Sequence, residues 1–365
     1  MSGPLSFDLF CRVVDNFGDA GVCWRLARRL ASLGQPVRLW IDRPDVLAQL
    51  LPSLILRPTG QTLEGVRVAP WNQAEQAMPP RGGVVIEAFA CALPTAYEAA
   101  MAGRDCLWIN LEYLSAEPWV EDCHGLPSLQ ANGVPKFFFF PGFTRATGGL
   151  LREPDLLTRC KTDQARDRGQ RLQALTGLLS APPADALCIL LFCYPDAPLA
   201  GLQSALASLD RPVWLLTPGP RPSGPLHHQN GLQVISIPFV PQARFDELLW
   251  CCDLNFVRGE DSLVRALWAG TPLVWQIYRQ AQEAHLEKLE AWLDQARWPG
   301  TAADLIHAWN QLDNDAVART LPAALREPVW SDWRARSLAW RTALSVRPDL
   351  GQDLLDFCLR KRQTR

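Results

Sequence analysis

The sequence predicts an α/β protein built from two doubly wound domains, and three observations carry this prediction. Short apolar runs alternate with helical patterns along almost the whole chain. Most of these runs are too continuously apolar to have a solvated face, which indicates parallel strands covered by helices on both sides. A charged helical stretch at 152–185 ends in Pro-Pro and separates two such series, and a length of 365 residues also favours two domains.

The first series contains five expected strands, separated by helical runs: FDLFCRVV, PVRLWID, GVVIEAFA, CLWINLEY and KFFFFPGF. Residues 20–34 place Cys23 and Leu30 on one stripe and arginines on the other, the pattern of an amphipathic helix. We expect the first domain to span 1–172 and to be completed by about 347–365.

The second series, expected to form a domain over 183–346, contains five further strands: ALCILLFCY, RPVWLLTPG, LQVISIPFV, CDLNFVRG and PLVWQIY. The tail that follows is helical and begins with three tryptophans within eleven residues, WSDWRARSLAW. We expect its last helix to cross back to the first domain.

Composition excludes several classes of protein. With 36 basic and 38 acidic residues the formal net charge is −2, so there is no electrostatic signature of a direct nucleic-acid binder. Eleven scattered cysteines without C-x-x-C spacing, and five histidines without ligand spacing, argue against a disulfide framework and a metal site. No basic, apolar leader and no run near 20 apolar residues is present. We therefore expect a cytoplasmic protein without a membrane partner.

The stretch DNFGDAG, residues 15–21, stands between the first strand and the first helix, where nucleotide-binding proteins hold a phosphate. Gly18 and Gly21 allow the sharp turn, but Asp15 and Asp19 would repel a pyrophosphate. Asp19 alone would also suit a helix N-cap, whereas Asp15, at a strand's carboxyl end, faces the crevice where open α/β sheets bind ligands. Two carboxylates suit either a cationic ligand or the removal of a proton from a nucleophile.

A second polar turn, Arg258-Gly-Glu-Asp-Ser262, opens a helix in the segment 238–278. Ser262 and the amides of that helix's first turn are expected to bind an anion, which the helix dipole would favour. Phe239, at the end of a strand, would stack on a base. The structural alternatives are that Ser262 or Asp261 only caps the helix and that Phe239 is a core residue. This order of elements resembles the donor half of two-domain GT-B glycosyltransferases.

The third stretch, 107–143, places Glu112, Tyr113, Ser115 and Trp119 after a strand end, on the side of the same crevice. Its alternative is a long ordered loop held by aromatic packing. The residues expected on the acceptor side come from this stretch and from the DNFGDAG turn: Asn16, Phe17, Gly18, Glu112, Tyr113 and Ser115.

Taken together, these segments resemble one family, the protein-arginine rhamnosyltransferases (EarP) that modify bacterial translation elongation factor P. The strings that carry the resemblance are long and unusual: FCRVVDNFGDAGVCWRLARRLA, NLEYLSAEPWVE, FFFFPGF, PFVPQ and FVRGEDSLVRALWAGTPLVWQIY. The resemblance implies a GT-B enzyme whose two Rossmann-like domains face each other across a cleft. It also implies transfer of rhamnose from dTDP-β-L-rhamnose to an arginine, with inversion and without a metal, which activates the factor for rescue of stalled ribosomes.

The resemblance also implies site residues. The catalytic residues it implies are Asp15, Asp19 and Glu260: the family's paired aspartates fall on Asp15 and Asp19, the second being the usual general base, and Glu260 is placed near the sugar. Phe239 is placed on the thymine with Gln242 beside it, and Tyr194 and Ser262 are placed at the diphosphate. The complete donor set is Phe192, Tyr194, Phe239, Gln242, Asp261 and Ser262. At Gln276 and Arg279 the sequence departs from the family's usual pattern, which leaves these roles unchanged.

Three other interpretations remain for comparison. A GT-B transferase that uses another nucleotide sugar and a lipid or small-molecule acceptor would need an apolar or basic membrane-facing patch, and none is visible in the sequence. An NAD-dependent oxidoreductase could use Asp42 after the second strand but lacks the glycine fingerprint. A non-catalytic partner of the translation factor would have no use for a carboxylate pair.

Overall fold

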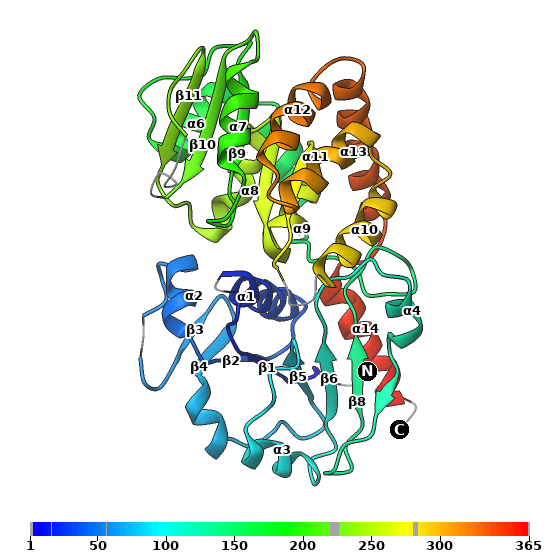
Figure 1. Cartoon of the computed structure of the whole chain (residues 1–365). Coiled ribbons are helices and arrows are strands. Elements are labelled where there is room, and N and C mark those ends of the chain that lie inside the picture. Colours follow the sequence, from blue (N-terminus) through cyan, green and yellow to red (C-terminus); the bar gives the residue numbers. More distant parts are fainter. Residues whose placement is uncertain (1–2, 16, 56, 220–225, 280–283, 364–365) are drawn as a thin grey trace. The chain divides into compact units, whose positions relative to one another are not determined.

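The computed structural model describes residues 3–15, 17–55, 57–219, 226–279 and 284–363, and Figure 1 shows the course of the chain. The chain divides into two compact units, one formed by Met1–Glu153 with Arg347–Arg365 and the other by Pro154–Val346. Each unit has its own sheet with helices packed on it, so the predicted α/β class with two parallel-sheet units is confirmed.

The sheet of the first unit has eight strands in the order β3-β4-β2-β1-β5-β6-β8-β7. Its two edge strands, β3 and β7, are antiparallel to their neighbours, and the other pairs are parallel. Every residue of β1, β5 and β6 is buried, as expected for strands covered on both faces. The bounds are β1 Phe7–Cys11, β2 Val37–Ile41, β3 Gln61–Leu63, β4 Val66–Pro70, β5 Val84–Ala88, β6 Leu107–Leu111, β7 Pro127–Ser128 and β8 Lys136–Phe139.

The helices of the first unit pack in two groups. The helix that follows β1, α1, contacts α2 and the C-terminal α14, whereas α3 packs with the 3-10 helix η1. Between the sheet and α3 lies an aromatic core that includes Phe10, Trp40, Tyr97 and Trp108. The bounds are α1 Phe17–Ser32, α2 Pro44–Leu50, η1 Trp71–Gln76, α3 Thr95–Met101, α4 Trp119–Cys123 and α14 Leu350–Gln363.

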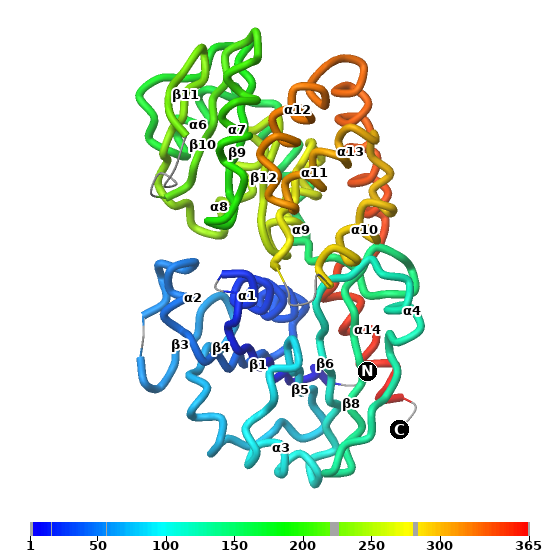
Figure 2. The backbone as a smooth tube through the Cα atoms, viewed as in Figure 1, coloured from blue at the N-terminus to red at the C-terminus, as the bar shows by residue number. Residues whose placement is uncertain are grey.

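The C-terminal helix α14 belongs to the first unit, although the second unit separates it in sequence from the rest. Figure 2 shows it in red beside the strands of that unit. Phe357 packs edge-on against Phe137 and Phe139 of β8, and Asp349 accepts two hydrogen bonds from Arg29 of α1 at 2.9 and 2.8 Å. The predicted return of the last helix to the first domain is confirmed.

The second unit is built on five parallel strands in the order β11-β10-β9-β12-β13. The strands are β9 Leu187–Leu191, β10 Val213–Pro218, β11 Leu232–Ile237, β12 Leu254–Arg258 and β13 Leu273–Gln276. The helices are α5 Leu156–Gln164, α6 Arg168–Thr176, α7 Leu199–Ala207, α8 Gln242–Cys251, α9 Gly259–Ala269, α10 Ala284–Ala296, α11 Gly300–Asn310, α12 Asn314–Ala324 and α13 Val329–Ser345.

The first unit ends at Glu153, earlier than residue 172 where we expected it to end. The physical reason is that α5 and α6 pack against α8, a helix of the second unit. The second change of unit, at Arg347, coincides with the expected position.

The tryptophans of α13 pack on rings from α10 and from the loop after it. The ring centroids of Trp298 and Trp333, for example, lie 5.9 Å apart.

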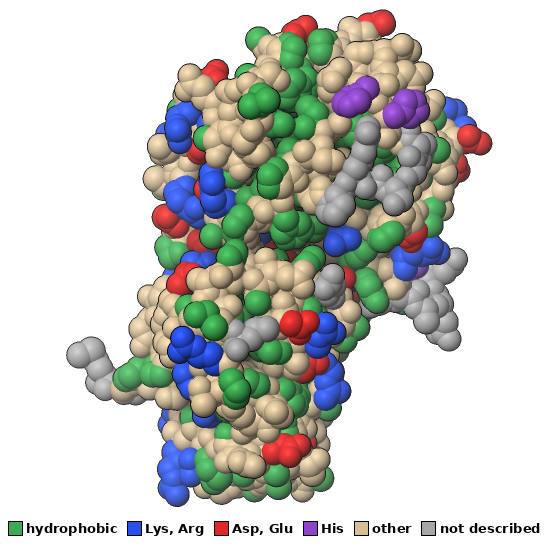
Figure 3. All heavy atoms as spheres, turned by 90° about the vertical axis from the view of Figure 1, so that its left-hand side faces the viewer, with side chains coloured by type: hydrophobic (Ala, Val, Ile, Leu, Met, Phe, Trp, Pro, Cys, Tyr) green, Lys and Arg blue, Asp and Glu red, His purple; other side chains and the backbone are tan. Residues whose placement is uncertain are grey.

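The cysteines and the surface charges agree with what the composition indicated. All eleven cysteines lie outside disulfides, and nine of them are buried. On the face shown in Figure 3, basic and acidic side chains are interspersed with apolar and neutral ones, in keeping with the formal net charge of −2.

Candidate active site

Asp19 is a buried carboxylate at the start of α1. It is the third residue of the helix and only 2% exposed. Its Oδ2 accepts hydrogen bonds from the backbone amides of Val14 at 2.7 Å and Asp15 at 2.8 Å. The side chain therefore reaches back over the loop that precedes the helix, and its charge lies at the favourable end of the helix dipole.

Asp15 lies against the same helical turn. Its carbonyl oxygen accepts a hydrogen bond from the amide of Gly18 at 2.6 Å, and a Cβ added to Gly18 would lie 2.8 Å from its Oδ2. Both predicted carboxylates are thus gathered at the amino end of α1. Phe17, half-buried, begins that helix, and Asn16, a predicted acceptor-side residue, lies outside the described residues.

Tyr113 joins the acidic loop from the segment that follows β6. Its hydroxyl donates to Oδ1 of Asp19 at 3.4 Å. The ring is stacked on Phe89, with centroids 4.2 Å apart and planes inclined by 9°. The structure therefore brings Tyr113 to the carboxylates, as the strand-end argument expected, and it adds Phe89, which the sequence gave no reason to single out.

Glu112 and Ser115, which flank Tyr113 in the sequence, form hydrogen bonds with nearby residues of their own segment. Oε1 of Glu112 accepts a hydrogen bond from Nδ2 of Asn110 at 2.5 Å. Ser115 is 6% exposed, and its hydroxyl donates to Oε2 of Glu117 at 2.8 Å. The aromatic packing proposed as the structural alternative is also present, because Trp119 lies edge-on to Phe140 at 5.5 Å.

In the second unit, the loop after β9 presents Phe192 and Tyr194 to one arginine. The guanidinium of Arg258 lies 4.6 Å from the centroid of Phe192 and 4.9 Å from that of Tyr194, and it donates to the carbonyl of Cys193 at 3.0 Å. Phe245 of α8 completes the group with an edge contact to Phe192 at 5.5 Å. The strand ends of β9 and β12 thus converge on an aromatic and cationic group, and two of its members, Phe192 and Tyr194, were predicted donor residues.

A buried polar network connects the two turns that were predicted to hold the donor. Nε2 of Gln242 donates to Asp261 at 3.2 Å, and Arg265 bonds Asp261 and Asp246, each at 2.9 Å. Gln242 is 5% exposed and Arg265 is 2% exposed. Separating α8 from α9 would leave a buried charge of this network without a partner, which is costly. The network therefore holds the starts of the two helices together.

The start of α9 shows how Ser262 is used. Its hydroxyl donates to the carbonyl of Arg258 and accepts from the amide of the same residue at 3.1 Å. This is the helix-start role that the sequence left open as an alternative. The acidic side chains of the first turn are compensated by cations, Asp261 by Arg265 and Glu260 by Lys288 at 2.7 Å. Negative charge in this turn is therefore offset, which an anion-binding helix end requires.

Phe239 and Gln276 have contrasting environments. Phe239 follows β11 and is 42% exposed, which excludes the alternative that it is a core residue. Gln276, at the end of β13, is 2% exposed; its Oε1 accepts from the amide of Tyr194 at 2.8 Å, and its Nε2 donates to Asp196 at 3.2 Å. Gln276 thus fixes the loop that carries Tyr194.

Comparison with known proteins identifies the family. The model of the family described as "Elongation-Factor P (EF-P) rhamnosyltransferase EarP" matches residues 7–359. The chain belongs to the EarP family. Two relatives, each named protein-arginine rhamnosyltransferase, come from Pseudomonas aeruginosa, 43% identical, and Pseudomonas putida, 44% identical; each alignment covers 96% of this chain and 98% of the relative. A third, from Neisseria meningitidis, is 34% identical over 98% of both chains.

Solved structures agree with the assignment to EarP. One, described as the structural basis for EarP-mediated arginine glycosylation of translation elongation factor EF-P, superposes with a TM-score of 0.63 at 33% identity, covering 96% of this chain and 98% of that chain. The spinosyn forosaminyltransferase SpnP, 13% identical and covered completely, has a TM-score of 0.56 and shows the shared fold. The predictions of an EarP-family glycosyltransferase and of a GT-B fold are confirmed.

The described residues were also compared with the requirements of a metal site and of a membrane-spanning helix. Among the residues that the structure describes, no group of three or more His, Cys, Asp or Glu side chains is arranged to hold a metal ion. No helix in the described ranges combines the length and the apolar character needed to cross a bilayer.

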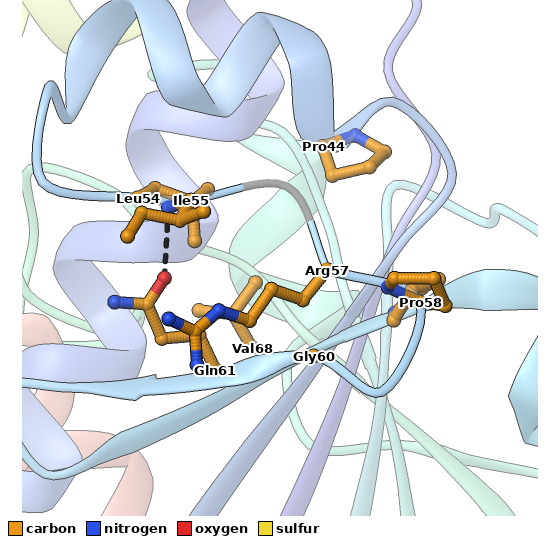
Figure 4. A pocket seen from close by; sticks show the side chains of 9 residues that line it. Pro44, Leu54, Ile55, Arg57, Pro58, Gly60, Gln61 and Val68 are labelled. Atoms are coloured by element: carbon orange, nitrogen blue, oxygen red, sulfur yellow. Dashed lines mark hydrogen bonds between the residues drawn. The ribbon is translucent and has the colours of Figure 1, made fainter.

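A pocket of about 220 Å³ lies beside β3 and β4 of the first unit (Figure 4). Its walls are mainly apolar, and Gln61 closes one side by accepting a hydrogen bond from the amide of Ile55 at 2.8 Å. The lining contains none of the site residues predicted for an EarP protein: Pro44, Leu54, Ile55, Arg57, Pro58, Gly60, Gln61, Val68 and Pro70.

Proposed function

We propose that the chain transfers rhamnose from dTDP-β-L-rhamnose to an arginine side chain of translation elongation factor P, with inversion at the anomeric carbon. The observation that carries this proposal is the pair of carboxylates, Asp15 and Asp19, gathered at the start of α1 in a member of the EarP family. We place the reaction in the cytoplasm because its acceptor is a translation factor.

The acceptor chemistry explains why a turn of this kind carries acids. A guanidinium has a pKa above 12, so it reaches the enzyme as a cation. Two carboxylates match its planar fork of N–H donors. An ordinary carboxylate cannot deprotonate it fully beforehand, because the pKa of such a carboxyl group is near 4. Proton removal must therefore accompany bond formation.

In the proposed step a guanidino nitrogen attacks the anomeric carbon of rhamnose. The C–N bond forms as the bond from that carbon to the diphosphate oxygen breaks, and the bonding electrons leave with dTDP. Asp19 takes the proton from the attacking nitrogen, while Asp15 orients the guanidinium and offsets its charge. Attack opposite to the leaving group turns a β-linked donor into an α-rhamnosyl arginine. Glu260 is assigned to the sugar.

The donor is assigned to the second unit. Phe239 is exposed enough to stack on the thymine, with Gln242 beside it. Phe192, Tyr194 and Asp261 complete the surroundings of the nucleotide. The departing diphosphate gains negative charge, which the first-turn amides of α9 beside Ser262 and the guanidinium of Arg258 would stabilise. No metal ion takes part in this scheme.

The test is to incubate the purified protein with dTDP-rhamnose and unmodified elongation factor P and to weigh the factor by intact-mass spectrometry. We expect a gain of one deoxyhexose, located on an arginine by peptide fragmentation, and no gain when that arginine is replaced by lysine. If the factor's mass stays unchanged while the donor is turned over with a lipid or small-molecule acceptor, the alternative GT-B function is correct.

A further inference from the structure

The loop that follows β5 adopts a backbone that its residues rarely tolerate. Phe89, Ala90 and Ala92 have φ values of +57°, +52° and +53°. This left-handed region disfavours every residue with a Cβ except in special surroundings, so each such residue adds strain to the backbone. Three of them within four positions persist only if neighbouring groups hold the loop in place.

Two buried side chains provide this hold. Glu87, the fourth residue of β5, is 3% exposed, and its Oε1 accepts from the amide of Ala92 at 3.0 Å. Asn110 of β6 is 2% exposed, and its Oδ1 accepts from the amide of Ala90 at 3.1 Å. The backbone amide of Phe89 itself donates to the carbonyl of Leu111 at 2.7 Å.

The carboxylate of Glu87 is in turn fixed by the sheet. Its Oε2 accepts from Nε1 of Trp108 at 3.2 Å and from Nζ of Lys136 at 3.1 Å. Lys136 also lies 4.8 Å from the centroid of Trp108. A buried carboxylate with a cation and two further donors is held firmly, so the strained loop rests on a rigid support.

Burial explains only part of this loop: Cys91 is buried in the aromatic core, but Phe89 is half-buried and Ala90 is exposed. What the conformation also achieves is the placement of the Phe89 ring. Phe89 lies flat against Tyr113 at 4.2 Å, and the hydroxyl of Tyr113 reaches Oδ1 of Asp19 at 3.4 Å. The second carboxylate oxygen, Oδ2, is already bound to the amides of Val14 and Asp15.

We propose that Phe89 is a positioning residue for the reaction, supported by Glu87 and Asn110. It fixes the plane of Tyr113, and Tyr113 fixes the orientation of the Asp19 oxygen nearest to it. This inference rests on the proposed function insofar as Asp19 is the base. Phe89 acts through Tyr113 and is assigned no contact with either substrate.

The kinetic test is a double-mutant cycle with Phe89→Leu and Tyr113→Phe. Phe89→Leu removes the stack and should lower kcat about tenfold, whereas Phe89→Tyr keeps a flat ring and should retain activity. In the Tyr113→Phe background, Phe89→Leu should have little further effect, because two residues that act through one contact are not additive. Additive losses, or a loss that Phe89→Tyr shares, would overturn the proposal.

A second readout does not depend on activity. The chain has only four tyrosines, so incorporation of 3-fluorotyrosine gives a fluorine NMR spectrum in which Tyr113 can be assigned by Tyr113→Phe. Phe89→Leu should shift and broaden the Tyr113 signal and leave that of Tyr97, in the same unit, in place. An unmoved Tyr113 signal refutes the positioning role. If the signal moves but the wild type transfers no sugar, the proposed function fails and the inferred positioning stands.

Discussion

Gly18 leaves no room for a side chain beside Asp15, because a Cβ at Gly18 would lie 2.8 Å from Oδ2 of Asp15. We therefore predict that Gly18→Ala displaces the Asp15 carboxylate and lowers kcat for rhamnosyl transfer at least tenfold. Donor affinity should stay unchanged, since the predicted donor residues belong to the other unit. Helix propensity should not lower the stability of this variant, because alanine favours a helix more than glycine does.

Gly103→Ala is the matched control for this prediction. No heavy atom lies within 4 Å of a Cβ added there, so this substitution should leave kcat, donor affinity and melting temperature as in the wild type. If Gly18→Ala also keeps wild-type turnover, Asp15 does not need its present position for the reaction.

Asp19→Asn should remove the proposed general base while keeping the loop. The amide oxygen of asparagine can still accept the hydrogen bonds that Oδ2 of Asp19 accepts from Val14 and Asp15. We predict that kcat falls by about 10²–10⁴, the range typical of a lost general base, and that the donor affinity measured by calorimetry is unchanged. Near-normal turnover of this variant would contradict the mechanism.

The strands of the two sheets show how much of the fold could be predicted from the sequence. All ten predicted strands are present, and most of them are continuous apolar runs, which report burial on both faces. β3, β4 and β7 escaped prediction: β3 and β7 are only three and two residues long, and β4 exposes Arg67 and ends in proline. The assignment of α5 to the second unit depends on packing against α8, which no local pattern encodes.

The candidate site divides in a similar way. Asp15 and Asp19 could be selected from the sequence because charged residues in a glycine turn after a strand are unusual there. Phe89 could not, because its importance comes from a strained backbone and a contact with Tyr113, 24 residues later. The pairing of Glu260 with Lys288 is likewise a contact between α9 and α10 that only the tertiary structure creates.

Phe239→Ala should weaken donor binding. Stacking of an aromatic ring on a base contributes about 1–3 kcal/mol, so we expect the Kd for dTDP to rise roughly 5- to 150-fold. Leu338→Ala, at a similarly exposed apolar residue of the same unit, is the control and should not change the Kd. Equal affinities for the wild type and Phe239→Ala would remove Phe239 from the donor site.

Gln276→Leu should disturb the loop after β9, which carries the proposed donor residue Tyr194. It removes the acceptor of the Tyr194 amide, and a buried amide left without a partner costs about 1–3 kcal/mol. We expect donor affinity to fall about tenfold. Arg279→Gln, which breaks only the exposed pair with Asp196, should change little. Wild-type affinity in Gln276→Leu would show that the loop does not need this support.

His124 should make the stability of the first unit depend on pH. Burial lowers the pKa of its imidazole from 6.5 to about 4, with the nearby charge of Arg360 acting in the same direction. Below pH 6.5 the unfolded chain therefore binds a proton that the folded chain does not, so stability is complete above pH 6.5 and is lost as the pH falls towards 4. At pH 5 the loss should be about 1–2 kcal/mol, allowing for partial solvent exposure.

Urea unfolding at pH 7.5 and 5 measures this loss of unfolding free energy. His124→Asn, which keeps an acceptor for the Phe140 amide, should remove the part of the pH dependence that His124 causes. Identical pH dependence in both proteins would show that His124 is not its source.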